Sequence, residues 1–124
     1  MKPVALLMIV AAALFLGGGF GWADSKDGPR RWTRTVKKQS EVVYKVVFVA
    51  SKSPNKQNAE FAVIGDGSTD VDILVFDAEG KEVAQDTFYT DLALVRWVPT
   101  KTQEYTIKVR NLGNVDNTCT MGHN

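Results

Sequence analysis

The segment that decides the fold is residues 104–110, which read Glu104-Tyr105-Thr106-Ile107-Lys108-Val109-Arg110. Apolar and polar residues alternate strictly along it, so an extended chain would place Tyr105, Ile107 and Val109 on one face. A helix would instead distribute these three side chains around its surface. The segment is therefore predicted to be a half-buried strand of an antiparallel sheet.

Other short runs rich in β-branched and aromatic residues precede this segment, and polar, Gly or Pro residues separate them. Gly80 lies between two of these runs, where a tight hairpin needs a residue with positive φ. No stretch after residue 23 has the 3.6-residue period of a helix. We therefore expect an all-β fold, a small antiparallel β-sandwich. Its expected strands are residues 42–50, 59–64, 71–77, 82–86, 92–98 and 104–110, with a last short one near 118–121.

The first residues have the pattern of a secretory signal peptide. Lys2 precedes an apolar run over residues 4–16, which is shorter than the about 20 residues of a membrane-spanning helix, and cleavage is expected after Ala23. The alternative is that this segment is retained as a membrane anchor. If it is cleaved, no stable membrane anchor remains. We thus predict a signal peptide (residues 1–23), a basic flexible arm (24–40) and a β-sandwich domain (41–124) in a secreted or periplasmic protein.

Composition limits the remaining possibilities. After cleavage the chain has room for one domain, and its single cysteine, Cys119, excludes an intramolecular disulfide. Basic residues predominate up to residue 58 and acidic residues from Ala59 onward, while the total charge is near zero. Nucleic acid is not an expected partner, because the protein is predicted to be exported.

Residues 59–121 resemble the bacterial pre-peptidase C-terminal domain family. The similarity rests on an acidic turn leading into a D-x-D-L-x-V-x-D strand, the hairpin and the strand that follow, and two later strand motifs. These are residues 65–77, 78–81, 83–86, 95–99 and 104–111. One departure is Gln103-Glu104, since the family usually has Gly before the tyrosine of this strand.

The resemblance implies a jelly-roll-like β-sandwich that occurs beside secreted peptidases and as free-standing secreted proteins. It also implies no shared catalytic residues, and roles in targeting, substrate binding or folding assistance. Some collagen-binding members of the family bind calcium as well. The expected function is a secreted, non-catalytic binding or accessory module whose partner is an extracellular protein or polysaccharide. The alternative is a structural or folding-assistance protein that docks on a secreted enzyme.

Acidic and hydroxyl side chains at alternate positions of the turn could offer oxygen ligands to one Ca²⁺ ion. The candidate metal ligands are Asp66, Ser68, Asp70, Asp72 and Asp77. They do not form an EF-hand, because Val71 occupies the position that needs Gly. Turn chemistry, in which these side chains accept hydrogen bonds from local backbone amides, is the favoured explanation.

Two other groups are candidate ligand contacts. Trp97, Tyr89 and Arg96 would form an aromatic platform if Trp97 were exposed, although a core position is favoured for that residue. The basic arm could bind a polyanion such as an acidic polysaccharide or a lipid surface, or it could be a solvated linker or dock on the acidic half. Its cations, around Trp32, are Arg30, Arg31, Arg34, Lys37 and Lys38.

Catalysis is not expected. Cys119 and the single histidine, His123, are four residues apart, which separates them by roughly 13 Å on an extended chain. A half-buried thiol and a solvated tail histidine are predicted instead. The chain contains no nucleophile-elbow, zinc-protease or phosphate-loop motif.

Overall fold

The computed structural model describes residues 25–51, 59–87 and 90–124. Within these ranges the chain forms eight strands and no helix, which confirms the all-β prediction. The strands are β1 (Arg30–Val36), β2 (Ser40–Phe48), β3 (Ala59–Ile64), β4 (Val71–Phe76), β5 (Glu82–Asp86), β6 (Leu92–Trp97), β7 (Gln103–Asn111) and β8 (Asn117–His123).

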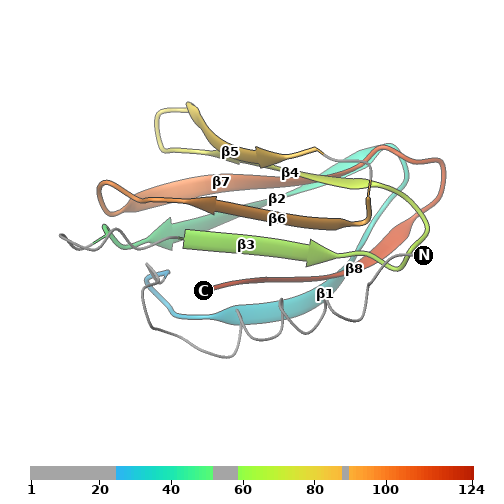
Figure 1. Cartoon of the computed structure of the whole chain (residues 1–124), viewed down its shortest axis with the longest axis horizontal. Coiled ribbons are helices and arrows are strands. Elements are labelled where there is room, and N and C mark those ends of the chain that lie inside the picture. The colour runs from blue at the N-terminus through green and yellow to red at the C-terminus, as the bar shows by residue number, and fades with distance from the viewer. Residues whose placement is uncertain (1–24, 52–58, 88–89) are drawn as a thin grey trace.

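The strands form two four-stranded antiparallel sheets packed face to face (Figure 1). The order is β1-β8-β3-β6 in one sheet and β2-β7-β4-β5 in the other, so consecutive strands repeatedly change sheet. This order is that of a jelly roll, a sandwich of two Greek keys. The β1–β2, β3–β4 and β7–β8 connections all lie at one end of the sandwich (Figure 1).

The core lies between the sheets and consists of the alternate residues of each strand. In β7 these are Tyr105, Ile107 and Val109, as the sequence pattern predicts, and each is at most 2% exposed. The β4–β5 hairpin also agrees with its prediction. Gly80 has φ +85°, and the Asp77 carboxylate accepts hydrogen bonds from the amides of Glu79 and Lys81 at 2.9 Å.

The prediction of a flexible arm is wrong for residues 30–36, which form β1. This strand pairs along its whole length with β8, from Arg30 opposite His123 to Val36 opposite Asn117. The domain also begins earlier than residue 41, because the amide of Ser25 donates to the backbone oxygen of Asn124. The pattern was misleading because β1 is an edge strand that carries cations where a central strand carries apolar side chains.

Candidate functional site

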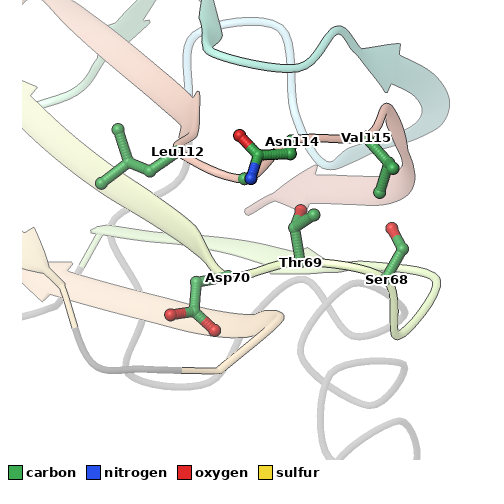
Figure 2. A pocket seen from close by; sticks show the side chains of 7 residues that line it. Ser68, Thr69, Asp70, Leu112, Asn114 and Val115 are labelled. Carbon is green, nitrogen blue, oxygen red and sulfur yellow. The ribbon is translucent and has the colours of Figure 1, made fainter.

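An open cavity of about 460 Å³ lies at the end of the sandwich, between the β3–β4 turn and the β7–β8 loop. We name this region the loop-end surface. Its residues are Ser68, Thr69, Asp70, Leu112, Gly113, Asn114 and Val115. Ser68 and Thr69 point toward the β7–β8 loop, whereas Asp70 points away from it (Figure 2). The surface therefore joins two loops that are more than 40 residues apart in the chain.

The two most exposed large apolar side chains among the described residues belong to this surface. Leu112 is 58% exposed and Val115 is 51% exposed, and they lie on either side of Asn114 in the β7–β8 loop (Figure 2). Hydroxyl, amide and carboxylate side chains line the rest of the cavity. Apolar groups surrounded by polar ones are typical of surfaces that contact another protein.

Buried Asn111 holds the β7–β8 loop in place. Its Nδ2 donates to the carbonyls of Val36 and Val115 at 3.0 and 2.8 Å, and its Oδ1 accepts from Thr69 Oγ1 and the Gly113 amide at 2.8 and 2.9 Å. One fully buried amide therefore connects three separate segments of the chain. Gly113 fits because a Cβ atom there would overlap the side chain of Thr69.

Gln39 supports the same loop from the β1–β2 turn. Its φ of 53° is rare for a residue other than glycine and carries a strain of about 1 kcal/mol. The side-chain Nε2 donates to the carbonyls of Leu112 and Gly113 at 2.7 and 3.0 Å, and the backbone amide donates to the Gly113 carbonyl at 3.1 Å. These hydrogen bonds offset the strain and fix the loop before any partner arrives.

The five candidate metal ligands do not converge. Asp66 accepts hydrogen bonds from Ser68 and from the Thr118 amide, which lower the pKa of its carboxyl. Asp77 instead caps the hairpin at the other end of β4. The described part of the chain contains no group of three or more His, Cys, Asp or Glu residues arranged to hold a metal ion.

Asp72 and Asp70 lie near each other but repel. Burial raises the pKa of the Asp72 carboxyl, and the charges of Asp70 and Asp86 raise it further, while Arg110 opposes them. Asp72 is the cross-strand partner of Arg110, which therefore serves as its counter-charge. Asp66, Ser68 and Asp77 thus have hydrogen-bond partners within the protein, and Asp72 has Arg110 as a counter-charge.

Trp97 occupies the core position that the sequence analysis favours, so it does not form an aromatic platform. Trp97 is 6% exposed and packs edge-to-face against Phe48 with ring centroids 5.1 Å apart, so it is a core residue. Tyr89 lies outside the described residues. Arg96 pairs with Glu60 across β3 and β6, with 3.2 Å between its Nε and the Glu60 Oε2. Burial raises the pKa of the Glu60 carboxyl, and Arg96 partly counteracts this effect.

Cys119 and His123 are both more buried than the sequence suggested. Cys119 is fully buried, and burial together with the charges of Asp66 and Asp91 raises its pKa to about 12. Its thiol is therefore protonated and a poor nucleophile at neutral pH. His123 is 3% exposed, because β8 continues to that residue and turns its ring inward.

Strand β1 places the cations of the predicted basic arm on different faces. Arg30 and Arg34 share the inward-facing row of β1 with Trp32, whereas Arg31 lies on the opposite face. Lys37 and Lys38 follow the strand, and the Lys38 amide donates to Asp116 at 2.9 Å. The five cations are therefore not one cluster. The sequence pattern, which predicts an arm here, carries no signal for the positions of Arg30 and Arg34 beside aromatic rings.

Comparison with known proteins identifies the fold. No family model matches the chain, and a search of curated proteins finds no match. Two similar solved structures are the mitogen of Yersinia pseudotuberculosis and PliG of Aeromonas hydrophila, a periplasmic inhibitor of g-type lysozyme. They are 12% and 11% identical to this chain, and each has a TM-score of 0.53. Both matches cover 77% of this chain. They cover 84% of the mitogen and 83% of the inhibitor. At this identity the similarity shows the fold.

The described residues include no helix long and apolar enough to cross a membrane.

Proposed function

We propose that this protein is an exported, non-catalytic binding module that contacts an extracellular protein through the loop-end surface. The observation that carries the proposal is the exposure of Leu112 and Val115 on loops that buried hydrogen bonds hold in one conformation. Exposing two large apolar side chains to water is unfavourable, and a partner that covers them recovers this energy. The fixed loops reduce the entropy lost on binding.

Two further observations support the proposal. The resemblance to pre-peptidase C-terminal domains suggests an accessory role beside secreted enzymes. The protein of similar fold from Aeromonas hydrophila is a periplasmic inhibitor of g-type lysozyme, so its target is another protein. The proposal invokes no calcium ion, because the hydrogen bonds of Asn111 already connect the loops of this surface.

Site-specific photo-crosslinking tests the proposal. A photoreactive phenylalanine analogue would replace Leu112 in one variant and Val43 in a matched control, which is 46% exposed on β2 and does not line the loop-end surface. Each purified variant would be irradiated with the exported proteins of the producing cell. We expect a discrete crosslinked species from position 112 that is absent from position 43.

A second variant checks that the crosslink reports real affinity. Replacing Leu112 and Val115 with serine should weaken binding of the crosslinked protein by roughly tenfold or more, because two apolar contacts are lost. Equal crosslinking from both positions, none from position 112, or binding that the serine variant retains would each refute a loop-end binding surface.

A further inference from the structure

A second concave site lies along one side of the sandwich, where β1 and β2 are the edge strands of opposite sheets. We name it the seam. It has a volume of about 200 Å³ and is lined by Arg30, Trp32, Tyr44, Lys45, Val46 and His123. This volume is below the about 300–1,000 Å³ of most sites for drug-sized ligands, so the seam suits a single small group.

The seam is positively charged. Arg30 and Lys45 line it, and Arg34 lies next to it with its guanidinium 5.8 Å from the centre of the Tyr44 ring. Within residues 25–51, 59–87 and 90–124, no ion pair involves any of these three cations, and no acidic side chain lines the site. Uncompensated cations in a concave site attract an anion.

Aromatic rings hold this site in one shape. The Trp32 Nε1–H donates to the Tyr44 hydroxyl at 3.1 Å, and the two ring centroids are 5.1 Å apart. Arg30 lies over Trp32, with its guanidinium carbon 5.9 Å from the ring centroid. Trp32 is only partly buried, so its ring also offers an apolar surface beside the cations.

His123 adds a hydrogen-bond acceptor to the seam. Its Nδ1 is 2.8 Å from the backbone oxygen of Asn124, and since this oxygen only accepts, the nitrogen must carry the proton. The Nε2 atom of the neutral ring then has a free lone pair. Burial and the charge of Arg30 lower the pKa of His123 by more than the hydrogen bond to Asn124 raises it, which favours this neutral form.

We propose that the seam binds an acidic sugar residue of an extracellular polysaccharide. Arg30 and Lys45 would bind the carboxylate, Trp32 would contact the apolar face of the sugar ring, and a sugar hydroxyl would donate to His123 Nε2. A fully ionised phosphate group offers no hydroxyl donor, so it would leave this acceptor unpaired. This site is separate from the loop-end surface and independent of the proposed protein partner.

An NMR titration with trigalacturonic acid tests the proposal, with galactotriose as the uncharged control. The indole Nε1–H signal of Trp32 reports on the seam and that of buried Trp97 serves as the internal reference. We expect trigalacturonic acid to shift the Trp32 signal in a saturable way that weakens with added salt. Galactotriose should bind at least roughly tenfold more weakly, because it lacks the charge.

Matched variants separate the site from general electrostatic attraction. R30Q/K45Q and R31Q/K37Q each remove two positive charges, but only the first pair lies in the seam. We expect the first to weaken binding by about tenfold or more and the second by less than about threefold. K45Q alone, at an exposed position, provides a milder variant should R30Q/K45Q fold poorly. The Leu112 and Val115 serine variant should bind the sugar normally.

Several outcomes would refute the proposal. These are an unmoved Trp32 signal, equal losses in both double variants, or equal binding of galactotriose. Binding to phosphatidylglycerol vesicles or to tetraglutamate, with trigalacturonic acid inactive, would assign the seam to a lipid surface or an acidic peptide instead.

Discussion

The loop-end surface and the seam are both open to solvent, yet they are built by opposite means. Buried Asn111 and the strained Gln39 hold the loop end through hydrogen bonds, and its most exposed groups are apolar. Aromatic packing around Trp32 holds the seam, and its exposed groups are cationic. The comparison shows that one scaffold can present an apolar and a charged surface when different interactions support each.

The largest effect is expected from Asn111→Leu at the loop end. Leucine has a similar volume but leaves two carbonyls, a hydroxyl and an amide without their partner. We expect the free energy of unfolding to fall by about 3 kcal/mol or more, because unpaired buried polar groups are costly. Urea denaturation measures the change.

Asn114→Leu is the matched control in the same loop. Asn114 is exposed, and its carboxamide receives only a 3.3 Å contact from Gln39, so this change should cost less than about 0.5 kcal/mol. Similar losses in both variants would mean that Asn111 does not hold the loop as we describe, and that the two regions differ less than the structure indicates.

The sequence predicted the strands of the core better than the regions at the surface. Alternation in residues 104–110 and the glycine at position 80 were enough for β7 and the hairpin, because both depend on local chemistry. Strand β1 was missed because Arg30 and Arg34 occupy inward-facing positions, where the pattern of a buried strand requires apolar residues. Cations can occupy these positions because the seam is open at its edge.

The sequence identifies single residues of the two surfaces, such as Ser68 and Arg30, but not how each surface is built. Asn111 and His123 are polar residues at the ends of strands, where sequence patterns indicate exposure. Their burial depends on segments more than 70 residues away, such as Val36 for Asn111. Alternation of residue types predicts which face of a strand a side chain lies on, but it does not predict which other segments pack over that face. The remaining residues of each surface, and their arrangement, were therefore accessible only from the three-dimensional structure.

A smaller effect is expected in the seam when the pH is lowered. Burial keeps the folded-state pKa of His123 below its ordinary value of 6.5, so the unfolded chain takes up a proton first. Stability is thus complete above pH 6.5 and decreases as the pH falls toward the folded-state pKa. The slope can reach about 1.4 kcal/mol per pH unit, the value for one proton.

Urea denaturation at several pH values between 7.5 and 5 measures this dependence. The chain has one histidine, and His123→Phe should remove its contribution while keeping ring contacts with Trp32 and Phe61. The raised pKa values of Glu60 and Asp72 act in the opposite direction in both proteins, so the comparison is between the two slopes. A wild-type protein that loses no more stability on acidification than His123→Phe would contradict a buried neutral His123.

The smallest effect on stability is expected from serine at Leu112 and Val115, although this change should have the largest effect on the proposed protein partner. Both side chains are more than half exposed, so their contacts contribute little to folding. We expect the free energy of unfolding to change by less than about 0.5 kcal/mol. A larger loss of stability would show that these two side chains stabilise the fold. An unchanged stability with lost binding would leave partner recognition as their role, because an exposed apolar pair that does not stabilise the molecule has no structural reason to be apolar.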